Sequence, residues 1–177
     1  MKRFLTILVA AVVFAAPVCA AQKRGGSDAD YAEIQAFHDK SIEKFNAGDL
    51  EGSLADYLER LRVLNTKRTT ITGRTEMRES WSKSFSSETT RPYLVSEIEE
   101  MELQGNGVGA WAYMVCRFAS AALDKATGAV KGDVSNGRYI ALMTKTADGW
   151  KVLLDIDNGA SGAAPDLAER LKKETAK

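Results

Sequence analysis

The chain has 177 residues, of which 45% are hydrophobic and 27% are charged. This is the composition of a folded globular protein, and it argues against disorder, collagen-like repeats and a multi-span membrane protein. Lysine plus arginine (24) equals aspartate plus glutamate (24), so no positive field attracts nucleic acid or an acidic membrane surface. Three prolines and no low-complexity tract predict one domain.

The first twenty residues have the pattern of a secretory signal peptide. Two basic residues open the chain, an apolar run follows over 4–16, and small residues stand at Ala20 and Ala21. The run is too short to span a bilayer core of ~30 Å. We therefore expect cleavage near Ala20-Ala21, a periplasmic or secreted location in a bacterium, and no membrane association afterwards. Cys19 would suit a lipid anchor, but the residues before it form a poor lipobox.

Loss of this segment leaves Cys116 as the one cysteine of the mature chain, so the core and not a disulfide must hold the fold. We expect a polar leader over 21–27 and a single domain over 28–160. Residues 161–177 would be a tail or a short helix.

Helices are expected in the first half. Ser27 followed by Asp30 resembles a capping box, and Gly48 suits the end of a helix because glycine adopts the left-handed conformation at low cost. One stripe of this helix carries Ile34, His38, Ser41 and Phe45.

Two further helices and two brief strands are expected next. Asp49 is predicted to cap a second helix that continues through Leu58, with strands near 62–64 and 69–72. Thr75 is predicted to cap a third helix with three apolar residues one turn apart, namely Met77, Trp81 and Phe85.

From Arg91 onward the hydrophobic period changes to two, which indicates strands. The strand-like runs cover 93–103, 108–118, 139–146 and 150–156. Asn106-Gly107 and Asp148-Gly149 each predict a tight hairpin, and 120–137 reads as a long connection of small residues. Helices followed by an antiparallel meander predict an α+β domain.

Both faces of the predicted sheet are apolar. Trp111, Tyr113 and Val115 alternate with Met114 and Cys116, and the strand over 139–146 is similar. A solvated antiparallel sheet alternates apolar with polar residues instead. Helices can cover one face, and a second copy of the chain is the simplest cover for the other, so we expect a homodimer through the sheet.

Several segments together resemble a known family. Residues 46–52 (NAGDLEG), Gly73 before the Trp81 helix, and the closing 148–151 (DGWK) and 155–158 (DIDN) are similar to the nuclear-transport-factor-2-like superfamily. Within it they resemble the SnoaL-like proteins and domain of unknown function 4440, over about 28–160. The resemblance implies a cone-shaped, cystatin-like α+β fold: three N-terminal helices pack into a strongly curved antiparallel sheet around an apolar pocket, often in a dimer.

This superfamily contains isomerases, polyketide cyclases, epoxide hydrolases, dehydratases and non-catalytic binding domains, so fold membership does not select a function. A gapless register with the ketosteroid isomerases, run from 46–52, places their oxyanion-binding tyrosine at Ser41 and their general-base aspartate on or near Asn65. An amide cannot accept that proton, and a serine hydroxyl is less acidic than a phenol. Ketosteroid isomerase chemistry is therefore not expected.

Three residues are candidate acid–base groups: His38, Asp56 and Asp155. His38 is the single histidine and has a pKa near neutrality, or it is a buried residue hydrogen-bonded near the pocket rim. Asp56 stands beside Tyr57, as an acid next to a phenol or as ordinary helix polarity. Asp155 and Asp157 are two residues apart on a strand and so share a face, for acid–base work or to cap a turn.

The candidate ligand-binding residues are mostly aromatic, because aromatic walls favour flat apolar ligands. They are Ser41, Tyr57, Trp81, Trp111, Tyr113, Arg117 and Tyr139. Arg117 would bind a ligand carboxylate, pair with Asp155, or form a structural ion pair. Cys116 reads as a small core residue. One histidine and one mature cysteine predict no metal site, and no motif predicts a cofactor.

The sequence thus predicts an exported protein that holds a small, mainly apolar molecule in a conical pocket. Two alternatives stay open. One is a pocket enzyme (hydrolase, dehydratase or isomerase-like), and the other is a dimeric protein-interaction module.

Overall fold

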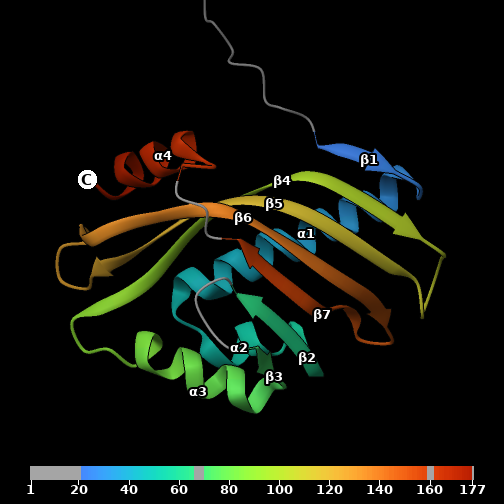
Figure 1. Cartoon of the computed structure of the whole chain (residues 1–177), viewed down its shortest axis with the longest axis horizontal. Coiled ribbons are helices and arrows are strands. Elements are labelled where there is room, and N and C mark those ends of the chain that lie inside the picture. Colours follow the sequence, from blue (N-terminus) through green and yellow to red (C-terminus); the bar gives the residue numbers. More distant parts are fainter. Residues whose placement is uncertain (1–20, 66–69, 159–161, 177) are drawn as a thin grey trace, which may run out of the picture.

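The computed structural model describes residues 21–65, 70–158 and 162–176 (Figure 1). The expected signal peptide over 1–20 lies outside the described residues, as does Thr69, the first residue of the strand expected over 69–72. Within the described parts, no helix combines the length and apolar character needed to cross a membrane.

The described strands form one seven-stranded sheet in the order β1-β4-β5-β6-β7-β2-β3 (Figure 1). Strands β4 to β7 are an antiparallel meander, and β2 pairs parallel with β7. The strands are β1 (Gln22–Arg24), β2 (Tyr57–Asn65), β3 (Ile71–Thr72), β4 (Thr90–Gln104), β5 (Trp111–Asp124), β6 (Val130–Thr146) and β7 (Gly149–Asn158). The helices are α1 (Asp28–Ala47), α2 (Leu50–Leu54), α3 (Arg74–Phe85) and α4 (Pro165–Thr175). The predicted α+β class is confirmed.

Local signals set the first helix as expected. Ser27 and Asp30 form a reciprocal capping box at the start of α1, and Gly48 ends the helix with a φ of 77°. Asn46 then attaches the helix end to the sheet, because its side-chain amide bonds both the carbonyl and the N–H of Leu94, at 2.8 and 2.7 Å. This pair of bonds sets α1 across the edge of β4.

The second and third helices differ from the prediction at their ends. Helix α2 ends at Leu54 and not near Leu58, because the chain turns and Tyr57 opens β2, whose backbone pairs with β7. Helix α3 begins after Gly73, whose φ is 87°, and not at a Thr75 cap. Long-range strand pairing and backbone geometry override the local helix signals at both positions.

The two central hairpins also differ from the prediction. Residues 105–110 connect β4 to β5, a wider loop than the two-residue Asn106-Gly107 turn. The predicted connection over 120–137 is wrong, since β5 and β6 continue through it and only 125–129 forms the turn. Small residues suit a strand here because α4 packs beside them: Ala121 contacts the buried cluster that Leu167 and Leu171 of that helix form with Ala119.

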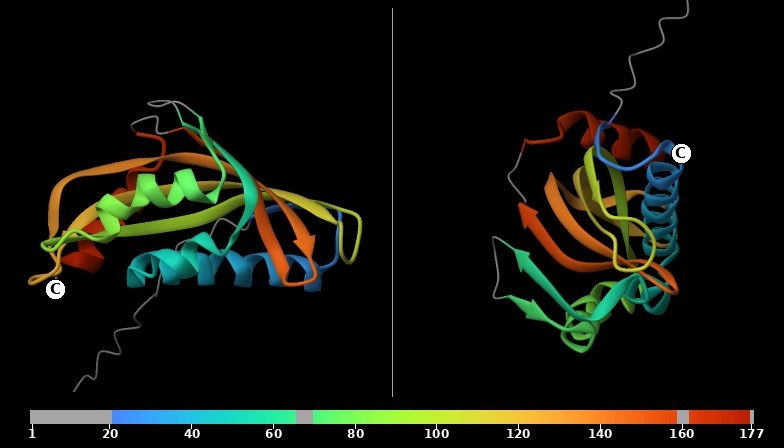
Figure 2. Two further views of the ribbon diagram at one scale, coloured as in Figure 1. Left: turned by 90° about the horizontal axis from the view of Figure 1, so that it is seen from below. Right: turned by 90° about the vertical axis from the view of Figure 1, so that its right-hand side faces the viewer.

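The C-terminal segment is a docked helix. Leu167 and Leu171 of α4 are buried against Val95 and Ala119, on the side of the sheet opposite α1. The right-hand view of Figure 2 places α4 and α3 on opposite sides of the sheet. Helix α4 therefore covers part of the outer face, for which the sequence predicted a second copy of the chain.

The polar leader expected over 21–27 contains β1. This strand runs parallel to β4 and pairs with Glu100–Glu102, although all three of its residues are exposed. Backbone hydrogen bonds alone can hold an edge strand. Its exposed polar residues do not alternate with apolar ones, so no hydrophobic pattern predicts β1.

Candidate functional site

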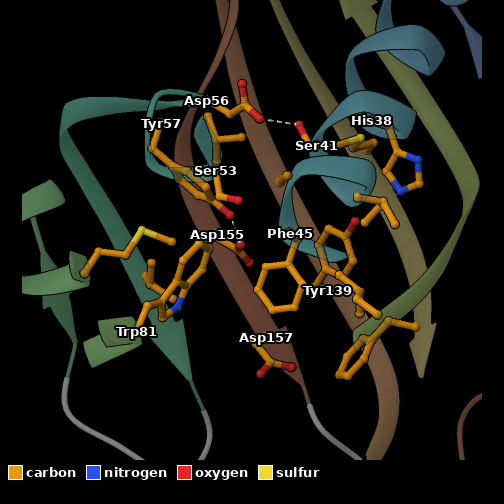
Figure 3. Close-up of a pocket in the computed structure, with 18 of the residues that line it drawn as sticks. His38, Ser41, Phe45, Ser53, Asp56, Tyr57, Trp81, Tyr139, Asp155 and Asp157 are labelled. Carbon is orange, nitrogen blue, oxygen red and sulfur yellow. Dashed lines mark hydrogen bonds between the residues drawn. The ribbon is translucent and has the colours of Figure 1, made fainter. Parts of the chain in front are cut away.

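A cavity of about 290 Å³ lies between the concave face of the sheet and helices α1, α2 and α3 (Figure 3). Its walls are largely apolar and aromatic. The aromatic residues that line it are Phe37, Phe45, Tyr57, Trp81, Phe118 and Tyr139. Such a concave, apolar space with a few polar groups is typical of small-molecule sites.

The aromatic wall is internally packed. The Trp81 ring makes edge-to-face contacts with Phe45 and Tyr57, with ring centroids 5.6 and 5.9 Å apart, and it stacks on Phe85 with a centroid distance of 5.8 Å. Edge-to-face and offset-stacked contacts are the favourable geometries for aromatic pairs. Three elements, α1, α3 and β2, thus hold one wall of the cavity in a fixed arrangement.

Asp155 on β7 is the carboxyl group at the centre of the site (Figure 3). The Tyr57 hydroxyl donates a long hydrogen bond of 3.4 Å to it. Burial raises the pKa of Asp155 to about 7, the charge of Asp157 adds to this, and the Tyr57 bond opposes it. Both protonation states of Asp155 are therefore populated near neutral pH. This is the condition for a group that donates or accepts a proton.

Two further polar side chains face the same cavity. Asp157 follows Asp155 on the inner face of β7, as their spacing predicted, and lines the pocket. Ser53 of α2 is 4% exposed, and its hydroxyl has no hydrogen-bond partner among the described residues. A buried hydroxyl without a partner costs free energy unless a ligand or water satisfies it. No sequence pattern indicates Ser53, because the burial of its hydroxyl depends on how α2 meets β2.

Asp56 is buried at the pocket wall but is already neutralised. The ammonium group of Lys44 lies 2.6 Å from one carboxylate oxygen, and the Ser41 hydroxyl donates to the other at 2.7 Å (Figure 3). This triad fastens α1 to the start of β2. The hydroxyl of Ser41, a ligand-binding candidate in the sequence analysis, is therefore already engaged in a hydrogen bond with Asp56.

His38 lines the cavity with both ring nitrogens engaged. Nε2 lies 3.1 Å from the Ser96 hydroxyl, and Nδ1 lies 3.3 Å from a carboxylate oxygen of Asp39. Burial lowers the pKa of His38, which favours the neutral ring. Ser96 in turn lies 3.2 Å from the Tyr139 hydroxyl, so a chain of hydrogen bonds leads from α1 to the pocket. The ring also borders a second cavity of about 260 Å³ beside α4.

Three of the candidate ligand-binding residues lie outside the pocket. Trp111, Tyr113 and Arg117 project from the outer face of β5, whereas Met114 and Phe118 line the cavity from its inner face. The sequence showed that these two sets alternate but not which set faces inward.

On the outer face each polar candidate has a local partner. The Tyr113 hydroxyl donates to Glu100 at 2.8 Å, and this bond raises its pKa to about 12. Arg117 pairs with Glu97 at 2.8 Å and with Asp166 at 3.0 Å, so it forms the structural ion pair and does not reach Asp155. Its partner Asp166 belongs to α4, and the sequence analysis did not predict where that segment packs.

No group of three histidine, cysteine, aspartate or glutamate side chains within the described ranges is arranged to hold a metal ion. Cys116 is fully buried in the core, and burial raises the pKa of its thiol to about 12. A protonated, inaccessible thiol is a structural residue.

The comparisons with known proteins agree with this geometry. A family model for the SnoaL-like domain matches residues 34–153. None of the curated proteins compared with the chain matches it.

Solved structures are similar in fold. A ketosteroid isomerase-like protein from Erwinia carotovora atroseptica SCRI1043 is 24% identical with a TM-score of 0.57, over 73% of this chain and 95% of that one. A cystatin-like domain of unknown function from Nostoc punctiforme PCC 73102 is 19% identical with a TM-score of 0.58, over 85% and 95%. A candidate scytalone dehydratase from Novosphingobium aromaticivorans DSM 12444 is 12% identical with a TM-score of 0.58, over 72% and 82%. These identities show the fold alone, a nuclear-transport-factor-2-like cone.

Proposed function

The chain belongs to the SnoaL-like domain family, and we propose that it is an exported protein that binds one small, mainly apolar molecule in its conical pocket. The observation that carries this proposal is the cavity of about 290 Å³ with its packed aromatic wall. Such a space excludes water from a flat apolar ligand, and burial of apolar surface contributes roughly 25 cal/mol per Å².

Native mass spectrometry of the protein, purified from the periplasm without detergent, tests this proposal. A reproducible extra mass on the folded protein supports it, and its release on denaturation identifies the ligand. Recovery in the cytoplasmic fraction with residues 1–20 still attached contradicts export.

A matched pair of variants tests whether the ligand occupies the pocket. Ser80 of α3 lines the cavity, whereas Ser84 is exposed on the same helix. Ser80→Trp fills the space and removes the extra mass, while Ser84→Trp retains it. Retention of the mass by both variants places the ligand elsewhere and contradicts the proposal.

A second candidate, an acid–base enzyme of the same pocket, is favoured by Asp155. Its raised pKa, about 7, and its central place in an apolar cavity suit a group that moves a proton. Among the three predicted acid–base residues, Asp56 is held by Lys44, and His38 has both nitrogens engaged. Turnover by such an enzyme, whether hydrolase, dehydratase or isomerase-like, would therefore depend on Asp155. An activity that survives in Asp155→Asn contradicts this candidate.

We also propose that two copies pair through the outer strip, the apolar outward-facing residues Trp111, Tyr113, Val115, Ile140, Leu142, Leu154 and Ile156. Trp111 is 44% exposed and Ile140 40% exposed, although both belong to inner strands of the sheet, β5 and β6. Exposed apolar patches of this kind mark interfaces, and a second copy or another protein would cover them. Light scattering that shows a monomer at micromolar concentration contradicts the dimer.

A further inference from the structure

Two carboxyl groups that line the cavity, those of Asp56 and Asp155, have different partners. Asp56 has the Lys44 ammonium group at 2.6 Å, whereas the neighbour that bonds Asp155 is the neutral hydroxyl of Tyr57. No lysine or arginine is among the described residues that line the cavity. The described part of the pocket wall thus supplies no positive charge to the Asp155 carboxyl group.

The surroundings of Asp155 suit a cation that also has an apolar body. Figure 3 shows the rings of Trp81 and Phe45 on either side of Asp155 in this view, with Tyr139 beyond Phe45. Aromatic faces attract a cation through their quadrupoles, and they do so most strongly where water is excluded. The same rings accept apolar groups, so one wall accommodates both parts of such a ligand.

A second acceptor is available in the same cavity. The Ser53 hydroxyl is buried and unpartnered among the described residues, and Figure 3 shows it on the Tyr57 side of Asp155. An ammonium group has several N–H donors, and one carboxylate cannot satisfy all of them. Ser53 provides a further oxygen, which a purely apolar ligand would leave without a bond.

We propose that the pocket selects an organic amine in its protonated form, with the ammonium group on Asp155 and Ser53 and a flat apolar body against the Trp81 and Phe45 wall. This rests on the proposed function and names the class of its ligand. An anionic ligand is disfavoured, because it would bring a second negative charge next to the Asp155 carboxylate in a largely apolar cavity. A neutral ligand makes the apolar contacts with the aromatic wall but does not form the charge-assisted hydrogen bond with Asp155.

Three probes of one shape separate these cases: 2-naphthylmethylamine, 2-naphthylmethanol and 2-naphthoic acid, titrated into the purified protein by calorimetry. The amine is expected to bind about tenfold or more tightly than the alcohol, as a charge-assisted hydrogen bond provides. The acid is expected to bind most weakly.

Variants assign the preference to Asp155. In Asp155→Asn the amine falls to the affinity of the alcohol, while the affinity of the alcohol is unchanged. Asp148→Asn, in the exposed turn before β7, is the matched control and keeps the preference. Amine preference that survives in Asp155→Asn overturns the proposal.

The pH dependence gives a readout that does not need a variant. As Asp155 ionises through about pH 7, affinity for the amine rises and affinity for the alcohol does not. The other titratable groups among the described lining residues are Tyr57 and Tyr139, whose pKa values are raised, His38, whose pKa is lowered, and the acids Asp56 and Asp157. The buried Cys116 thiol, which contacts Tyr139, also has a raised pKa. An amine affinity that is flat across this range overturns the proposal.

Failure of this inference differs from failure of the proposed function. Equal binding of the amine and the alcohol overturns amine selection and leaves an apolar pocket that binds small molecules. Absence of binding by all three probes overturns both.

Discussion

The inner and outer faces of the sheet differ in whether their charged side chains have partners of opposite charge. On the outer face, Arg117 of β5 is matched by Glu97 from the neighbouring strand and Asp166 from α4. On the inner face, the one hydrogen bond that Asp155 of β7 makes to a described residue is the long one from Tyr57, and its pKa is raised to about 7. The outer face is organised for stability, whereas the inner face keeps a destabilising group beside an open cavity. Such a group persists where function requires it.

The largest expected loss of stability comes from a substitution where α4 covers the outer face of the sheet. Leu171 of α4 is fully buried against β4 and β5, so Leu171→Ala should lower the free energy of unfolding by about 4 kcal/mol through lost burial and a cavity. Urea denaturation measures this. The neighbouring exposed Lys172→Ala should change stability by less than about 0.5 kcal/mol. Equal effects of the two variants would show that α4 is not docked.

The next effect concerns Asp155 and has a sign that depends on pH. Its folded pKa is raised from 3.8 to about 7, so its contribution to stability is complete below about pH 3.8 and is lost as pH rises through 7. Asp155→Asn cannot ionise and should therefore be more stable than the unmodified protein at about pH 8, by about 4 kcal/mol. Near pH 4 the two proteins should be about equally stable. Thermal unfolding across pH tests this, and a destabilised variant at pH 8 would contradict the assignment.

A matched pair of tryptophans compares the faces directly. Trp81 packs in the inner aromatic wall, whereas Trp111 is 44% exposed on the outer strip. Trp81→Ala should cost about 2 kcal/mol and abolish ligand binding, because it opens the pocket wall. Trp111→Ala should leave ligand binding unchanged and weaken self-association in light scattering. The reverse pattern would show that the outer face binds the ligand.

The smallest effect concerns the ion pairs of the outer face. Arg117→Gln should cost about 1 kcal/mol, since Arg117 is only partly buried but bonds two carboxylates. The loss should diminish at high salt, because screening weakens the pairs in the unmodified protein as well. Chemical denaturation at low and high salt measures both. Salt-independent loss would indicate lost packing of the arginine stem instead.

Features that depend on neighbours in the sequence were predictable. The Ser27 and Asp30 capping box and the Gly48 stop define α1 as expected, because each acts within one helical turn. The shared face of Asp155 and Asp157 followed from the two-residue period of a strand. The helix stripe through His38, Ser41 and Phe45 likewise faces the cavity.

Features that depend on distant parts of the chain were not predictable. Alternation along β5 separated Tyr113 and Arg117 from Met114 and Phe118, but only the position of α1 makes the second set the inner one. Tyr57 leaves the helical pattern because β7 offers its backbone a partner.

The sequence by itself determined the α+β order of the elements, the first helix and the alternation of the strands, since these arise from local propensity and periodicity. Tertiary structure decided that Lys44 neutralises Asp56, that α4 covers Ala119, and that Asp155 faces an aromatic cavity. The physical reason is that burial and charge compensation depend on which surfaces meet across the fold. A one-dimensional pattern specifies faces but not their partners.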